Sequence, residues 1–271
     1  MSNCVEPDEV QTSIHSARDN SDAETQYFSA YDVLYDVIST NGKLLKAETT
    51  ILPSSAIITY TDTTFDDGDG IEFSVDFGPL GVEVPKGVLC QDGRYRSGKL
   101  NIRANTKFDD PKMKVEMIIS EDDQFFTGNG SEMNQLTGTT TVHRAGLLSL
   151  GIDIKDARIL TPEYTLTWNS TRIVKLMEDN GPGIWGDKYK LTGSATGTNR
   201  FNEAYTVTID EPLVKKMEAG CARTFVAGKL TITGTASEPA ISIDYDPYDN
   251  QACDAQAEAE INGRKTIFSV R

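Results

Sequence analysis

A period-two alternation of apolar and polar residues runs through most of the chain and limits its fold more than any other feature. Ile71, Phe73, Val75 and Phe77 alternate with polar residues. The same pattern recurs in segments 164–168, 205–209, 230–232 and 241–245. It is typical of antiparallel strands with one face on a core. Turn sequences such as Asp67–Gly70 separate the segments. We therefore expect an all-β, antiparallel fold of roughly 12 to 16 strands.

One helix is predicted ahead of the strands, over residues 24–38. The pattern Ser21–Glu24 resembles a capping box at its start. Because the apolar side chains share one face, Asp32 and Asp36 are expected to be exposed. Tyr31, Leu34 and Ile38 are expected to be buried. Its apolar residues recur at helical spacing: Tyr27, Tyr31, Leu34, Tyr35 and Ile38.

The two halves of the chain resemble each other and predict two related β units. Each half contains a strand, a Pro-Leu pair, a cysteine and a Gly-Lys strand, in that order. The matching pieces are 73–80 with 205–213, Cys90 with Cys221, and 98–102 with 228–232. The expected organisation is helix plus first unit over 24–150 and second unit over 151–271, as sandwich-like units or one continuous sheet. Segments 73–102 and 205–232 are expected to superpose strand for strand.

The charge balance argues against several functions. Lys plus Arg total 26 and Asp plus Glu total 41, for a net charge of −15. Nucleic-acid binding needs clustered cations and is not expected, nor is peripheral binding to an anionic membrane. With only His15 and His143, a zinc site built on several histidines is excluded. No long apolar run predicts a spanning helix. No cofactor motif and no catalytic constellation is identified, and His143 is interpreted as structural.

Residues 1–23 are polar and are predicted to form a disordered tether. Within them, Cys4 is followed by acidic residues and a polar spacer, as in the acylated N-terminal cysteine of a bacterial lipoprotein. The apolar region of a signal peptide is absent, so on this interpretation Met1 is not the natural start. The alternative is a free cysteine in a flexible N-terminus.

Longer motifs carry a family resemblance. Asp76–Gly78 followed by Cys90–Lys99, which reads CQDGRYRSGK, resembles the FG…C-DGR-x-R-x-GK segment of uncharacterised Bacteroidetes lipoproteins, chiefly flavobacterial. Ile243–Tyr245, Cys253–Asp254 and Ile261–Lys265 resemble the C-terminal segments of that family. The resemblance implies an exported β protein on the outer membrane, facing the cell surface and attached through Cys4. It implies no activity.

The cysteines predict one disulfide. Extracytoplasmic compartments favour disulfides. Cys221 precedes the strand at Gly228 and Cys253 follows the next strand, so a meander returns both to the same end of the sheet. We expect Cys221 to pair with Cys253 and Cys90 to remain a buried free thiol. A short Cys90–Cys221 distance would instead pair the two equivalent cysteines.

Individual ligand candidates are few. Asp67 and Asp69 resemble part of a calcium loop but lack its distal glutamate, so a solvated turn is favoured over a metal site. Trp185, in a glycine-rich loop, is the aromatic residue predicted to be exposed for ligand contact, whereas Trp168 is expected in the core. Arg94, Arg96 and Lys99 are expected to pair with strand carboxylates.

Together these features predict a non-catalytic, surface-exposed lipoprotein, a structural or binding module of the cell envelope. Its membrane contact would be the lipid anchor alone, and its ligand a glycan or a protein. The alternative is an envelope glycan hydrolase using paired carboxylates. A groove lined by two carboxylates and exposed aromatic residues would favour the hydrolase, and a smooth charged sheet would favour the module.

Overall fold

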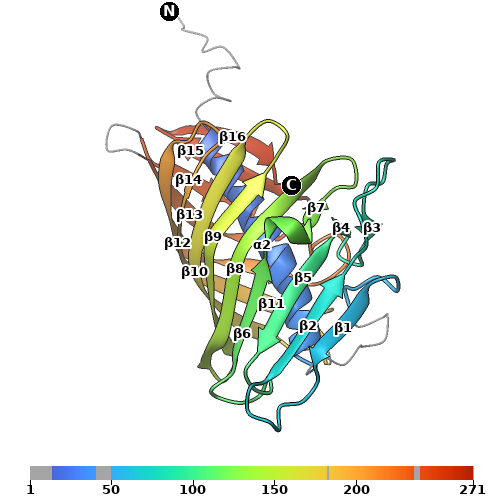
Figure 1. Cartoon of the computed structure of the whole chain (residues 1–271). Helices are drawn as coiled ribbons and strands as arrows, with labels where there is room; N and C mark the ends of the chain where they lie inside the picture. The colour runs from blue at the N-terminus through green and yellow to red at the C-terminus, as the bar shows by residue number, and fades with distance from the viewer. Residues whose placement is uncertain (1–13, 41–49, 182, 235–238, 271) are drawn as a thin grey trace, which may run out of the picture.

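The computed structural model describes residues 14–40, 50–181, 183–234 and 239–270. These residues form one α-helix, α2 (His15–Ile38), a short 3-10 helix, η1 (Glu121–Asp123), and a sixteen-stranded sheet (Figure 1). The strands of the first half are β1 (Ile57–Asp62), β2 (Ile71–Asp76), β3 (Val88–Leu89), β4 (Tyr95–Ser97), β5 (Lys99–Ala104), β6 (Lys114–Ile119), β7 (Phe126–Gly128) and β8 (Met133–Gly146). Those of the second half are β9 (Ser149–Leu160), β10 (Thr165–Glu178), β11 (Lys188–Thr198), β12 (Ala204–Lys216), β13 (Ala227–Thr233), β14 (Ile241–Asp244), β15 (Gln256–Ile261) and β16 (Arg264–Ser269). The predicted all-β, antiparallel class with one N-terminal helix is confirmed.

The sheet is a single antiparallel meander. Its main path runs β1-β2-β5-β6-β8 and then in chain order to β16, while β3, β4 and β7 form a branch that joins at β8. The predicted boundary between residues 150 and 151 falls inside β9, and pairing is continuous on both sides of that strand. No helix among the described residues has the length and apolar character needed to cross a membrane.

The curved sheet wraps around α2, which lies along its concave side (Figure 1). Tyr27 on the helix stacks on Trp168 of β10 with ring centroids 5.6 Å apart, and its hydroxyl donates to the Thr137 carbonyl at 2.7 Å. Near the start of the helix, the Ser21 and Tyr245 hydroxyls are 3.0 Å apart. Strands from both halves of the chain therefore enclose one helix, and Trp168 lies in the core as expected.

The helix begins at His15, nine residues before the predicted start at residue 24. Residues 14–23 are therefore not part of a tether, and the predicted capping pattern Ser21–Glu24 lies inside the helix. The error has a physical cause, because polar residues here have partners on the sheet instead of water. Asn20 Oδ1, for example, accepts a hydrogen bond from Trp168 Nε1 at 3.1 Å. Residues 1–13 lie outside the described part.

The predicted polar face of α2 is also wrong. Tyr31, Leu34 and Ile38 are buried as expected, but Asp32 and Asp36 are buried too. The helix is covered on all sides, so each inward carboxylate needs a partner from the sheet or a loop. The partners of these carboxylates are described in the next subsection.

The expected internal duplication is only partly reproduced. Both halves contain an adjacent antiparallel pair, β2 with β5 and β12 with β13. The register differs, because Val75 lies opposite Leu100, whereas Val207, its counterpart in sequence, lies opposite Ile232 and not Leu230. In addition, β3 and β4 occur only in the first connection. The prediction of strand-for-strand equivalence is therefore wrong.

Candidate functional site

Within the described residues, three ion pairs link α2 to the sheet or to a loop. Each pair joins an acidic residue of the helix to a cation that the sheet or a loop supplies. Arg172 of β10 makes two hydrogen bonds to Glu24, from Nε to Oε1 at 2.9 Å and from Nη2 to Oε2 at 2.7 Å. Neither side chain is exposed. The other two pairs are Asp19 with Arg200, after β11, and Asp32 with Lys215 of β12.

A fourth buried ion pair, between Arg96 and Asp92, contains no helix residue but contacts the helix. Arg96 of β4 donates from Nη1 to Asp92 Oδ1 at 2.9 Å and from Nη2 to the Ser29 carbonyl of α2 at 3.1 Å. Burial alone would raise the pKa of Asp92, but the charge and hydrogen bonds of Arg96 outweigh it and lower that pKa below 3.8. Arg96 thus pairs with a turn carboxylate, not with the strand carboxylate that was expected.

Asp36 is buried, and among the described residues no cation pairs with it. Its Oδ2 accepts hydrogen bonds from the Thr50 hydroxyl and from the Ile51 amide at 3.0 Å, and its Oδ1 accepts from the Ile184 amide at 3.3 Å. Burial raises the pKa of Asp36, and these hydrogen bonds only partly offset the effect. This residue joins the C-terminal turn of the helix to two loops, which is a structural role.

One cavity in the described part of the interior is very small. Beside the C-terminal end of α2 lies a cavity of about 10 Å³, lined by Ile38, Phe65, Ile71 and other mainly apolar residues. That is close to the least volume that holds one water molecule. The buried charges of the helix and the sheet bind each other, as Glu24 binds Arg172 and Asp32 binds Lys215, which is a structural role.

A larger cleft opens at the ends of β10, β11 and β12. Its volume is about 270 Å³, and it is lined by Glu178, Gly186, Asp187, Lys188, Lys216, Met217 and Glu218. Burial raises the pKa of Asp187. Its oxygens already accept hydrogen bonds from the Asn180 amide at 2.9 Å and the Tyr189 hydroxyl at 2.6 Å. None of the described residues that line the cleft is aromatic.

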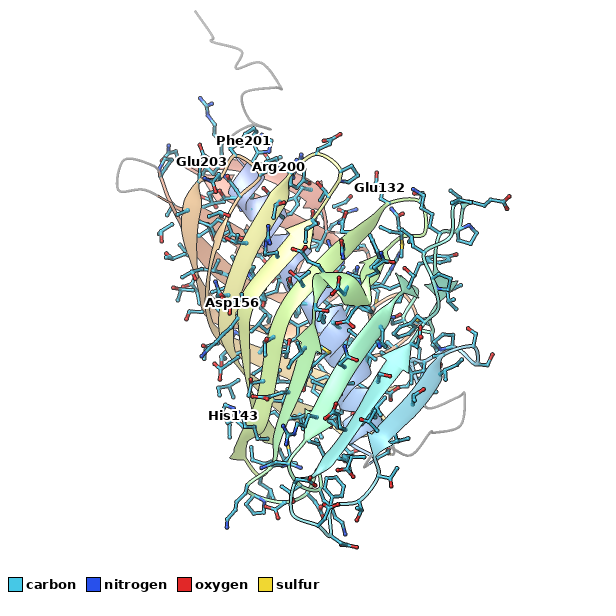
Figure 2. The ribbon with its side chains drawn as sticks, in the orientation of Figure 1. Glu132, His143, Asp156, Arg200, Phe201 and Glu203 are labelled. Carbon is cyan, nitrogen blue, oxygen red and sulfur yellow. A yellow bond between two sulfur atoms is a disulfide. The ribbon has the colours of Figure 1, made fainter. Side chains whose placement is uncertain are left out.

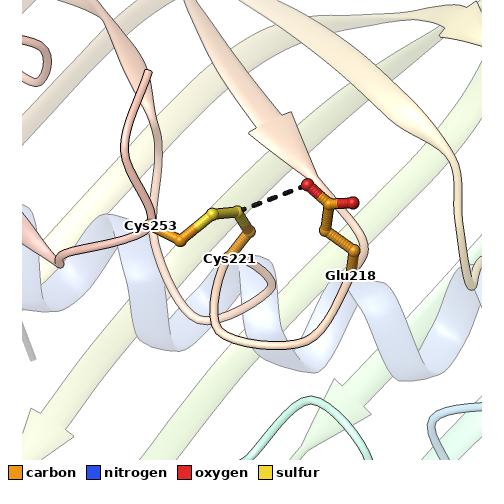
Figure 3. Close-up of side chains that lie close together, drawn as sticks. All are labelled: Glu218, Cys221 and Cys253. Atoms are coloured by element: carbon orange, nitrogen blue, oxygen red, sulfur yellow. Dashed lines mark hydrogen bonds between the residues drawn. A yellow bond between two sulfur atoms is a disulfide. The ribbon is translucent and has the colours of Figure 1, made fainter. Parts of the chain in front are cut away.

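The disulfide is confirmed. Cys221, between β12 and β13, bonds to Cys253, between β14 and β15, with Cα atoms 4.6 Å apart (Figure 3). Glu218 Oε1 lies 3.6 Å from Cys221 Sγ. These three residues are not a metal site, because both sulfurs are joined to each other. Cys90 is a buried free thiol, as expected, whereas Cys4 lies outside the described residues.

The remaining predicted ligand contacts do not assemble a site. Trp185 is only partly exposed and packs against the core, so its prediction as an exposed aromatic is wrong. Its loop folds inward because the neighbouring Ile184 is fully buried. Asp67 and Asp69 meet Asp62 in an acidic cluster at the surface, and this cluster alone does not indicate an ion. His143 lies 4.0 Å from Asp153 and is about half exposed.

The convex face carries a row of polar side chains that the sequence pattern alone did not bring together. The row contains one residue from each of seven adjacent strands: Thr141, Asp153, Thr171, Ser194, Thr208, Thr231 and Ser242. Each is the register partner of the next. The row places six hydroxyl side chains and the carboxylate of Asp153 next to each other across the sheet. The alternation of apolar and polar residues predicts which side chains of each strand face outward. Only the order and register of the strands show which of these side chains are neighbours.

Comparisons with known proteins give no assignment. No protein-family model matches the chain, and neither the curated proteins nor the solved structures include a significant match.

Proposed function

We propose that this chain is a non-catalytic, exported module of the cell envelope that is lipid-anchored through Cys4 and binds its partners on its outer surface. One observation supports the proposal that the module is not an enzyme. The concave side of the sheet, which would otherwise offer a binding cavity, is filled by α2 and its paired charges.

Two further features support the envelope. The Cys221–Cys253 disulfide suits an oxidising compartment. The sequence around Cys4 and the motif Cys90–Lys99 resemble surface lipoproteins of Bacteroidetes. The partner is a glycan or another protein, met by side chains of the convex face such as Thr171 and Thr208, which are exposed.

The test of the anchor uses cells that produce the protein with its natural leader. The Cys4→Ser variant is expected to leave the membrane fraction and to lose labelling by a fatty-acid analogue. Cys90→Ser, which changes a buried cysteine elsewhere, should keep both. Membrane retention and labelling of Cys4→Ser would contradict the anchor, and protection of the wild type from protease on intact cells would contradict surface exposure.

One observation favours a hydrolase instead, namely the cleft with its three carboxylates, Glu178, Asp187 and Glu218. Hydrolysis needs a carboxylic acid free to reach the glycosidic oxygen. Asp187 has the raised pKa of such an acid, but both of its oxygens are held by protein donors. Incubation of the purified chain with envelope glycans is expected to yield no products. Hydrolysis that Asp187→Asn abolishes would replace our proposal.

A further inference from the structure

The turn joining β8 to β9 exposes two adjacent leucines. Leu147 is 92% exposed and Leu148 is 53% exposed. The hairpin is held against β10, because the Leu176 amide donates to the Leu148 carbonyl at 2.9 Å. Beside it, Met177 of β10 is also exposed. The result is a convex apolar tip at the end of the molecule marked by His143 in Figure 2.

Unpaired lysines flank this tip. Lys175 of β10 and Lys190 of β11 are register partners, and both are exposed. Within the described residues neither forms an ion pair with a carboxylate. Like charges directly opposite each other on neighbouring strands destabilise a sheet. An anion bound over this pair would remove that cost.

The cleft described above adjoins these lysines and carries charges of both signs, because Glu178, Asp187 and Glu218 line it together with two lysines. Lys188 and Lys216 are register partners on β11 and β12, and both line the cleft. Lys188 is partly neutralised by Glu178 at 3.4 Å. We name Leu147, Leu148, Met177, Lys175 and Lys190 the tip surface, and the cleft adjoins it.

We propose that the tip surface docks onto a lipid bilayer containing anionic headgroups. A projecting apolar turn fits a fluid acyl layer, while lysines set behind it fit the headgroup level. A second copy of this chain is a poorer occupant, because two copies meeting at this tip would bring their own exposed lysines, Lys175 and Lys190, close to each other. The net charge of −15 does not exclude the bilayer, since charges more than about 8 Å away are screened at physiological salt. This contact is additional to the proposed anchor and does not depend on it.

The test uses the full, non-acylated chain and sedimentation with two kinds of vesicle, phosphatidylcholine alone and phosphatidylcholine mixed with phosphatidylglycerol. Binding is expected only to the anionic vesicles and should weaken with added salt. The double variant Leu147→Ser with Leu148→Ser should bind at least about tenfold more weakly, because it removes apolar area that the bilayer buries. Lys175→Glu with Lys190→Glu should abolish binding.

Two matched control variants test whether any loss of vesicle binding is specific to the tip surface. Val82 is 95% exposed in the loop between β2 and β3, so Val82→Ser removes an exposed apolar side chain elsewhere. Lys155→Glu reverses an exposed charge on β9 away from the tip surface. Both should bind as the wild type does. Lack of wild-type binding to anionic vesicles, or equal losses in the controls, would overturn the proposal. So would a dimer in analytical ultracentrifugation that the double leucine variant dissolves.

Discussion

Glu24 and Arg172 face each other inside the sheet with two hydrogen bonds and no exposed side-chain surface. They are 148 residues apart in sequence. Each would be strongly destabilising alone, because an ion without its partner keeps its desolvation cost. The pair therefore fixes how α2 sits in the sheet more than it adds net stability.

The first prediction concerns this pair. Arg172→Met should lower the free energy of unfolding by about 3–5 kcal/mol, since it leaves Glu24 buried without a cation. Adding Glu24→Leu should recover most of the loss. Lys114→Met is the control, because its pair with Glu116 is exposed and should change stability by less than about 1 kcal/mol. Denaturant titration measures all three, and a double variant as unstable as the single one would contradict the account.

Acid should weaken the Asp92–Arg96 pair. The folded-state pKa of Asp92 lies below 3.8, so its stabilising contribution is full above 3.8 and is lost as pH falls through the folded pKa. Asp92→Asn should thus lower the free energy of unfolding at neutral pH and make that free energy less dependent on pH in the acid range.

Asp36 should show the opposite pH dependence of stability, because burial raises its pKa. For Asp36, stability declines as pH rises from 3.8 through the folded pKa, and Asp36→Asn should remove that decline. Unfolding followed by circular dichroism from acid to neutral pH checks both signs.

Reduction of the Cys221–Cys253 disulfide should destabilise the protein. The Cys221–Cys253 bridge closes a sequence separation of 32 residues, which corresponds to about 3–4 kcal/mol in the chain-entropy treatment. A thiol reductant should lower the melting temperature of the wild type. The variant Cys221→Ser with Cys253→Ser should melt at the reduced value with or without reductant. A wild type that melts identically in both conditions would exclude a contribution from the bridge.

A comparison of two glycines that have nearly the same φ can separate the cost of backbone strain from the cost of a steric clash. Gly98 and Gly263 have φ of 78° and 77°. A Cβ at Gly98 would lie 1.9 Å from the Gln124 carbonyl oxygen, whereas one at Gly263 would meet nothing within 4 Å. Gly263→Ala should cost about 1 kcal/mol for the positive φ alone, and Gly98→Ala should cost at least about 2 kcal/mol more. Equal losses in chemical denaturation would show that the backbone at Gly98 shifts freely.

The sequence predicted those features that depend on local pattern. Alternation identifies strands such as β2, whose Phe73 and Val75 are buried, and meander logic identifies the Cys221–Cys253 bridge. The environment of α2 could not be found this way. Asp32 is a solvent-facing residue by helical periodicity, and only Lys215, 183 residues later, makes its burial possible. The pairs Lys175–Lys190 and Thr171–Ser194 likewise depend on strand register.

The contact between Ser21 and Tyr245 spans 224 residues. The helix is made first, yet strands from the last part of the chain complete its enclosure. A nascent chain that ends before β14 can form local hairpins, but it leaves part of α2 without cover. Such a topology is expected to fold slowly and as one cooperative unit after synthesis is complete.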